Sequence, residues 1–209
     1  TKNKASKIQS PPALGDLGGE KRFNRSQSHQ SPRDPPSLST MYYDASQFEF
    51  VHLLEANWKI IQQELKQLAP QHFIPYPERY LLDRRTGWDV FGLYFVGVKI
   101  DLNCALCPET ARLVKQIPGM ITAGFSRLAP GAHIVPHSGR PSGVLRCHMG
   151  LDVPEKCALR VAHEVRAWKE GKCMVFDDTS EHQAWNLSDR YRDVLLLDFK
   201  APPGFLPGS

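Results

Sequence analysis

The sequence lacks any run of 18 or more apolar residues, the length that a transmembrane helix needs. Its first ten residues, TKNKASKIQS, lack the apolar core of a secretory signal peptide. These absences predict that the chain contains no membrane segment. Because the chain starts at Thr1 rather than at Met, an upstream membrane anchor or a lumenal location of a longer protein stays open.

Cysteine is scarce, and the five cysteines stand at scattered spacings that do not resemble a disulfide framework. A reducing compartment such as the cytoplasm is therefore favoured. Cys104 and Cys107 form a CxxC pattern, but no second CxxC and no nearby histidine completes a zinc site. We predict a structural role for these two cysteines, and the sequence leaves open whether they pair.

Aromatic side chains are almost absent from residues 1–41, where Phe23 is the single one among five prolines and seven serines. So little apolar surface cannot offset the entropy lost on ordering a chain, and we predict a disordered tail. The tail holds seven Lys and Arg against three Asp and Glu, a surplus equal to the +4 of the whole chain. Because these basic residues are not interleaved with aromatics, we expect no nucleic-acid partner.

Regular apolar spacing predicts an ordered domain at residues 42–209. Residues 44–68 predict one amphipathic helix, whose apolar face consists of Phe50, Leu53, Leu54, Trp58, Ile61 and Leu65. A short helix is expected before Pro118 and Gly119, where the chain must turn. Eight further runs, from WDVFGLYFVGV to YRDVLLLDFKA, have strand character and are separated by turn signals. The pattern predicts an antiparallel sandwich or small barrel with the helix packed outside.

One predicted strand has a basic face. In VLRCHMG, Arg146 and His148 are two residues apart and point to the same side, while Leu145, Cys147 and Met149 point to the other. A buried charge needs a partner, and an anionic ligand would provide one. Arg192, which precedes the apolar run DVLLLDF, suits forked binding of a carboxylate.

Histidines near this face suggest a metal site. His133 and His137 are not a helical pair, because Pro130, Gly131 and Pro136 exclude a helix there. We identify His137 and His182, on two different strands, as candidate metal ligands. Spacing alone leaves open whether they bind a metal or are ordinary hydrogen-bonded histidines.

Residues 121–202 resemble the aspartyl/asparaginyl β-hydroxylase family of Fe(II)- and 2-oxoglutarate-dependent dioxygenases. The matching words are FSRLAPGAHIVPHSG, LRCHMGL, WKEGKCMVFDDTSEHQAWN and the arginine of YRDVLLLDF, in the family's order and spacing. The resemblance implies a mainly β fold, a double-stranded β-helix (a jelly-roll or cupin-like barrel) with flanking N-terminal helices. It also implies that His137 and His182 bind iron.

The resemblance implies further site residues. Gly139 stands where related iron enzymes have a third, carboxylate ligand, and glycine at this position is typical of the β-hydroxylase branch rather than of the similar lipid A acyl-chain hydroxylases. Asp177 and Asp178 would either orient His182 or cap a turn. The implied 2-oxoglutarate site comprises Ser126, Leu128, Arg146, His148 and Arg192. For the substrate we expect Tyr94 or Trp88 at the entrance, and Arg140 and Arg160 either near the mouth or on the solvated surface.

The implied function is Fe(II)-, 2-oxoglutarate- and O2-dependent hydroxylation of the β-carbon of aspartyl or asparaginyl residues in a peptide or protein. Two alternatives stay open. One is the same chemistry on an acyl chain or a small amino-acid derivative, and the other is a catalytically silent barrel used for binding. The substrate follows from family analogy, which is a weaker argument than site geometry.

Overall fold

The computed structural model describes residues 41–83, 87–139, 143–203 and 205. Two predictions fall wholly or almost wholly outside these ranges: the disordered tail at 1–41, of which only Met41 is described, and the placement of Arg140.

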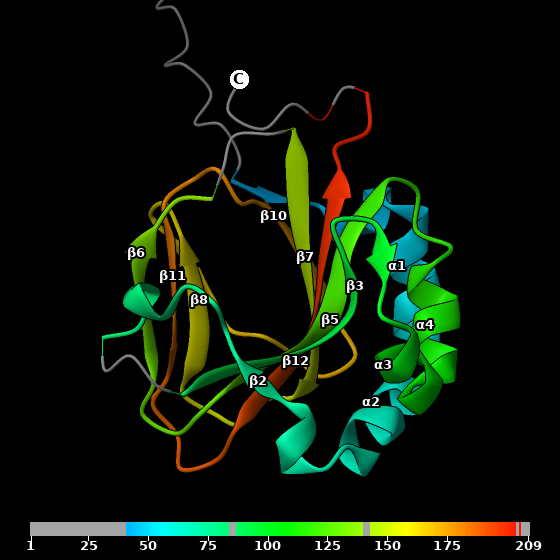
Figure 1. Ribbon diagram of the computed structural model, residues 1–209. Coiled ribbons are helices and arrows are strands. Elements are labelled where there is room, and N and C mark those ends of the chain that lie inside the picture. The colour runs from blue at the N-terminus through cyan, green and yellow to red at the C-terminus, as the bar shows by residue number, and fades with distance from the viewer. Residues whose placement is uncertain (1–40, 84–86, 140–142, 204, 206–209) are drawn as a thin grey trace, which may run out of the picture. The chain divides into compact units, whose positions relative to one another are not determined.

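The helices lie together beside the strands (Figure 1). They are α1 (Glu49–Ala56), α2 (Trp58–Gln67), α3 (Asp101–Leu106) and α4 (Pro108–Val114). The prediction of one continuous helix over residues 44–68 is wrong, because α1 and α2 are separated at Asn57. The Asn57 side chain donates a hydrogen bond of 2.8 Å to the Leu53 carbonyl, so it competes with the backbone pattern of the helix. The predicted short helix is confirmed as α4.

Most strands form one eight-stranded sheet in the order β1-β10-β7-β12-β5-β3-β2, with β4 paired to β3. All of its pairs are antiparallel. The strands are β1 (Tyr42–Tyr43), β2 (Ile74–Pro75), β3 (Trp88–Phe95), β4 (Val98–Lys99), β5 (Met120–Leu128), β7 (Val144–Asp152), β10 (Cys173–Asp177) and β12 (Arg192–Lys200).

A four-stranded antiparallel sheet, in the order β6-β11-β8-β9, faces the large one. Its strands are β6 (His133–His137), β8 (Cys157–Val161), β9 (Glu164–Arg166) and β11 (His182–Asn186). In Figure 1 the small sheet lies on the left, the large sheet in the middle and the helices on the right. The expected double-stranded β-helix with flanking helices is confirmed.

Two apolar cores hold the three layers together. The helix-side core joins α1, α2 and α4 to the large sheet and includes Leu54, Ile61, Leu65, Phe91, Phe125, Cys147 and Leu197. The barrel core fills the space between the sheets and includes Trp88, Leu128, Leu159, Trp168, Phe176 and Val194. Cys104 and Cys107 are free thiols buried in the helix-side core, which confirms their predicted structural role.

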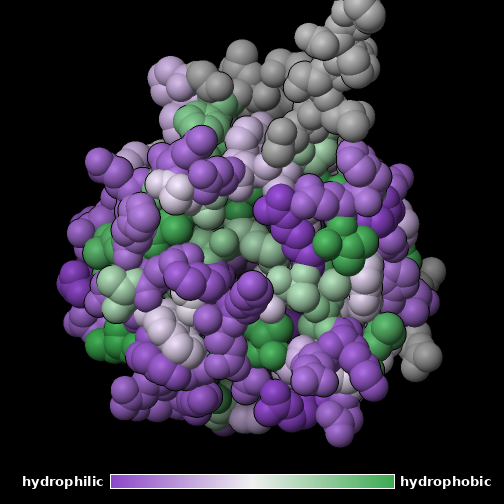
Figure 2. Space-filling view, turned by 180° about the vertical axis from the view of Figure 1, so that it is seen from behind, coloured by the Kyte–Doolittle hydropathy of each residue, from purple (hydrophilic) through white to green (hydrophobic). Residues whose placement is uncertain are grey.

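The face of the molecule opposite to the view of Figure 1 is mainly polar. Hydrophilic residues cover most of the face in Figure 2, with smaller apolar patches between them. Within the described residues, the helices are too short and too polar to cross a bilayer.

Candidate active site

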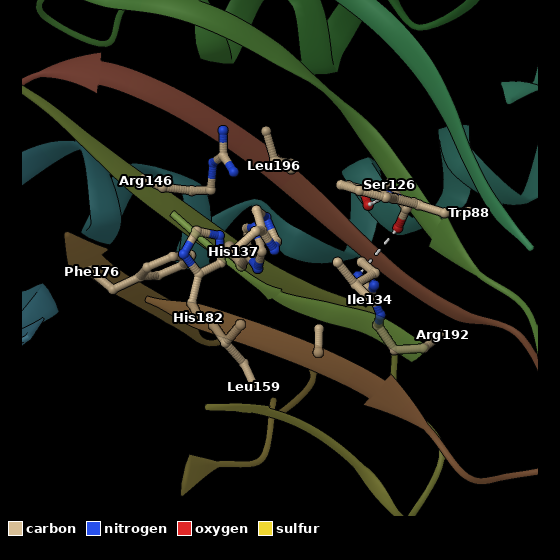
Figure 3. Close-up of a pocket in the computed structure, with 12 residues that line it drawn as sticks. Trp88, Ser126, Ile134, His137, Arg146, Leu159, Phe176, His182, Arg192 and Leu196 are labelled. Atoms are coloured by element: carbon tan, nitrogen blue, oxygen red, sulfur yellow. Dashed lines mark hydrogen bonds between the residues drawn. The ribbon is translucent and has the colours of Figure 1, made fainter. Parts of the chain in front are cut away.

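A pocket lies between the two sheets, next to the barrel core (Figure 3). Twelve side chains line it: Trp88, Ser126, Ile134, His137, Arg146, His148, Leu159, Phe176, His182, Ala184, Arg192 and Leu196. Arg146 and His148 face the pocket, while Leu145, Cys147 and Met149 belong to the helix-side core. The predicted basic face of β7 is therefore confirmed, and it is turned inward.

His137 and His182 occupy one end of the pocket, near Arg146 (Figure 3). We call this the histidine end and include in it Asp178, which contacts Arg146 and His182. The two histidines are register partners on β6 and β11, and their ring centroids are 4.2 Å apart. Each Nδ1 lies 2.8 Å from a backbone carbonyl, of Val135 for His137 and of Ser180 for His182. A carbonyl only accepts, so each Nδ1 carries a proton, and Nε2 is the nitrogen of each ring that offers a lone pair in the neutral form.

This arrangement suits metal binding. Burial, and then the neighbouring His137, lower the pKa of His182 to about 3, so its imidazole is neutral at pH 7. Neutral imidazoles whose other nitrogen is anchored to a carbonyl are the usual histidine ligands of metals. No group of three or more His, Cys, Asp or Glu suited to a metal occurs among the described residues, so the histidine pair stands without a third protein ligand.

Asp178 fills the place that a side chain at position 139 would take. A Cβ atom on Gly139 would lie 1.8 Å from Asp178 Oδ2, and the Gly139 amide donates a hydrogen bond of 2.7 Å to the Asp178 carbonyl. Asp178 Oδ1 is also 3.4 Å from His182 Nε2. Glycine is therefore required here, because the carboxylate of Asp178 approaches the histidines from another part of the chain.

Arg146 is held by two carboxylates. Its Nε and Nη2 donate to Asp198 at 2.7 and 3.0 Å, and its Nη1 lies 2.6 Å from Asp178 Oδ1. Burial alone would lower the pKa of Arg146, but Asp198 and Asp178 outweigh it and raise the pKa. At the histidine end, the charge of this guanidinium is thus neutralised within the protein.

Arg192 occupies the opposite end, which we call the arginine end together with Ser126, Trp88 and Trp168. In Figure 3 Arg192 and Ser126 lie apart from the two histidines. Arg192 is 1% exposed and makes no ion pair with a carboxylate in the part of the chain that the structure describes. Its Nη1 is 3.5 Å from the Ser126 carbonyl, which is a weak contact. Burial lowers the pKa of Arg192 to about 10, so it remains charged at pH 7.

Unpartnered polar atoms gather around this pocket. Of the described residues, the buried side-chain atoms without a hydrogen-bond partner are Nδ1 and Nε2 of His148, Nε1 of Trp168, Nε of Arg192 and Oδ1 of Asp178, the last of which is ion-paired with Arg146. Burial, followed by Arg146, Arg192 and His182, lowers the pKa of His148 well below its usual value. Buried polar groups are normally satisfied, so this concentration indicates a site for a polar ligand.

Of two further predicted 2-oxoglutarate residues, Ser126 lies at the pocket as expected and Leu128 does not. Ser126 lines the pocket, where its Oγ accepts a hydrogen bond of 3.0 Å from Trp88 Nε1. Leu128 is fully buried in the barrel core and is not among the lining residues. The leucines that line the pocket are Leu159 on β8 and Leu196, which is on the same face of β12 as Arg192.

The expected substrate residues need correction. Tyr94 lies in the helix-side core, on the other side of the large sheet, because a register shift between Gly92 and Tyr94 reverses the alternation of β3. Trp88, the alternative, does line the pocket. Arg160 follows Leu159, which faces the pocket, so Arg160 points away from it and donates to Glu181 at 2.8 Å and to the Ala162 carbonyl.

Comparisons with known proteins find relatives that are named as hydroxylases. A family model described as aspartyl/asparaginyl beta-hydroxylase matches residues 55–202. The ornithine lipid ester-linked acyl 2-hydroxylase of Rhizobium tropici is 41% identical over 169 residues, which cover 77% of this chain and 60% of that protein. The human aspartyl/asparaginyl beta-hydroxylase is 34% identical over 165 residues, which cover 74% of this chain and 21% of that protein.

Solved structures give a weaker likeness. A cupin-superfamily sugar phosphate isomerase from Silicibacter pomeroyi superposes with a TM-score of 0.40 at 17% identity, over 66% of this chain and 74% of that one.

Proposed function

Since the chain belongs to the aspartyl/asparaginyl β-hydroxylase family, we propose that its pocket is the active site of an iron(II)- and 2-oxoglutarate-dependent hydroxylase. The relatives named above are longer than this chain, so the proposal concerns the domain that it contains. Three features of the pocket support it: the paired imidazoles, the unpaired guanidinium, and their presence in one cavity.

His137 and His182 are the proposed iron ligands, because both present an Nε2 lone pair from rigid strands. When bound, iron(II) with 2-oxoglutarate and dioxygen would supply the oxidising power to insert one oxygen atom into an unactivated C–H bond, while the other oxygen atom enters succinate and carbon dioxide is released. The Ser180 carbonyl, which accepts from His182 Nδ1, would keep the His182 ring in position, and Asp178, which is held by Arg146, lies 3.4 Å from the proposed ligand atom Nε2. No described side chain is needed as an acid or base for the C–H step.

The observation that carries the proposal is the buried, unpaired charge of Arg192. A guanidinium removed from water without a carboxylate partner is costly, and a bound carboxylate would offset that cost. We propose that Arg192 and Ser126 bind the distal carboxylate of 2-oxoglutarate. His148 and Arg146, which lie toward the histidines, would contact its other end.

The substrate that we propose is an aspartyl or asparaginyl residue in a peptide or protein, with hydroxylation at its β-carbon. A second candidate is an ester-linked acyl chain, which the 41% identity to the Rhizobium tropici acyl 2-hydroxylase favours. The two candidates share one chemical feature. The β-carbon of an aspartyl residue and carbon 2 of an acyl chain are both methylene groups next to a carboxyl-derived carbonyl.

An anaerobic titration with Fe(II) and 2-oxoglutarate tests the cofactor part of the proposal. We expect the visible charge-transfer band of the chelate in the wild-type protein and its loss in His137→Ala, with the fold of the variant verified by circular dichroism. A folded wild-type protein that gives no band would contradict the proposal and favour the silent barrel.

A second experiment separates the two substrates. The iron-loaded protein is incubated with peptides containing Asp or Asn and, in parallel, with ester-linked acyl lipids, and products are analysed by mass spectrometry for the gain of one oxygen atom. Succinate is measured in both reactions. Oxygen gain in the lipid alone would replace the peptide proposal by the acyl one, and ligand binding without succinate in either reaction would favour the silent barrel.

A further inference from the structure

Trp168, to which the sequence assigned no role, packs against two charged or polar groups of the pocket. It lies between β9 and β10 and is 4% exposed. Its ring lies under the Arg192 guanidinium, with 4.6 Å between the guanidinium carbon and the ring centroid. The same ring is nearly parallel to His148, at 6.1 Å and 27°. Trp168 thus forms the wall behind the arginine end.

Gly150 makes this position possible. Arg146, His148 and Gly150 occupy alternate positions of β7, so a side chain at 150 would point into the same space. A Cβ atom there would lie 2.4 Å from the Lys169 carbonyl oxygen. The segment after Trp168 is fixed to β7 at this point, by the hydrogen bond of 2.9 Å from the Gly171 amide to the Gly150 carbonyl. Trp168 is therefore held by backbone contacts that are independent of any ligand.

The Trp168 ring stabilises the charge of Arg192, which has no carboxylate partner among the described residues. A guanidinium without a carboxylate would be stabilised in few ways, and a desolvated cation over an indole face is one of the stronger ones. We propose that Trp168 is a positioning residue, which holds Arg192 by this contact so that its N–H groups point into the pocket toward a carboxylate ligand. This inference rests on the proposed function, since the ligand in question is 2-oxoglutarate.

Another arginine in the chain provides a control. Arg127 also lies over an aromatic ring, that of Phe73 at 4.1 Å, but its charge is paired with Asp193 through two hydrogen bonds of 2.8 and 2.9 Å. Arg127 does not line the pocket. Removing the ring of Phe73 should therefore leave ligand binding unchanged.

The test is the dissociation constant of 2-oxoglutarate for the Fe(II)-loaded protein without oxygen, measured by calorimetry for Trp168→Phe, Trp168→Leu and Phe73→Leu. Succinate is a second probe, used without metal, because it has two carboxylates and no chelating keto group. We expect Trp168→Leu to weaken both ligands about tenfold or more, and Trp168→Phe, which keeps an aromatic face, to recover most of this loss. Phe73→Leu should bind like the wild type.

If Trp168 had a structural role alone, Trp168→Leu would lower the thermal midpoint, but the affinities for 2-oxoglutarate and succinate would not fall and then recover in Trp168→Phe. In turnover, Trp168→Leu should raise KM for 2-oxoglutarate while kcat at saturation and the iron requirement change little. Should Trp168→Leu not fold, Gly150→Ala replaces it. The added methyl group would displace the Lys169 segment, and Trp168 with it, while every residue that lines the pocket stays unchanged. Affinities within twofold of wild type in the folded variants would overturn the role of Trp168, whereas a wild-type protein that binds neither probe would overturn the proposed function and this role with it.

Discussion

Each end of the pocket contains a buried arginine, and the two arginines differ in whether their charge is paired within the protein. Arg146 and Arg192 lie on adjacent strands of the large sheet and face the same cavity. At the histidine end, Arg146 is bound by Asp198 and Asp178. At the arginine end, Arg192 is more deeply buried, and among the described residues it has only a long contact with a carbonyl and the face of Trp168.

The two arginines differ in whether the protein itself supplies the partner of the charge. A buried ion pair whose partners are both in the protein is complete in the folded state, and removal of one partner leaves the other unpaired. A buried cation without a protein partner lowers stability, unless a ligand supplies the missing anion. The arginine end therefore lacks an anion that a ligand can supply. At the histidine end, the charged groups around the two imidazoles are already paired with one another.

The largest effect is expected when the histidine end loses a metal ligand. His182→Ala should remove iron binding and abolish turnover, because only two protein ligands are proposed. Iron content after anaerobic loading and succinate formation measure this. Circular dichroism and the thermal midpoint of the variant show whether its fold is intact, and substantial succinate production by it would remove His182 from the metal site.

Arg146→Met should destabilise the metal-free protein by about 3 to 5 kcal/mol, because Asp178 and Asp198 would be left as buried carboxylates without their partner. Urea unfolding at pH 7 measures the free energy of unfolding. A loss below about 1 kcal/mol would mean that solvent screens this pair and that the two ends do not differ as described.

Arg192→Met should have the reverse effect on stability and a clear effect on binding. The ligand-free protein should unfold with an unchanged or higher free energy, since the substitution removes an unpaired buried cation from the core. The affinity for 2-oxoglutarate should fall by about 2 to 3 kcal/mol, or about 30- to 150-fold. Parallel urea unfolding and calorimetry of the two methionine variants measure both quantities, and an unchanged affinity would exclude Arg192 from the ligand site.

Strand alternation predicted much of this comparison from the sequence. The parity of β7 alone turns Arg146 and His148 to one face, and the same rule would have turned Arg160 outward, given that Leu159 faces the pocket. Tyr94 shows where the rule fails, because one extra residue in β3 reverses the faces, and Gly92 beside the shift is the mark of it in the sequence.

Contacts between distant segments could not be predicted. That Asp178 fills the space beside Gly139, 39 positions earlier in the chain, depends on how β6 and the turn before β11 come together. Arg146 is paired because the register between β12 and β7 places Asp198 opposite it, and the sequence does not give that register. Trp168 lies in a polar stretch outside any strand, and only the contact of its segment with Gly150 brings it to the pocket.

The smallest expected effect concerns the proton equilibrium of His148, which both ends influence. Burial first, and then the charges of Arg146 and Arg192, lower its pKa well below 6.5 in the folded state. The unfolded chain therefore binds a proton below about pH 6.5 that the folded protein does not bind. This histidine makes the free energy of unfolding fall as the pH falls below that value, by about 1.4 kcal/mol per pH unit.

His148→Leu should make the measured slope of the free energy of unfolding between pH 6 and 5 shallower by about that amount. Leu196→Ala, which changes packing but no titrating group, should keep the slope of the wild type. Equal slopes in the wild type and His148→Leu would mean that His148 takes up its proton in the folded state, in which case water or an anion already reaches its ring.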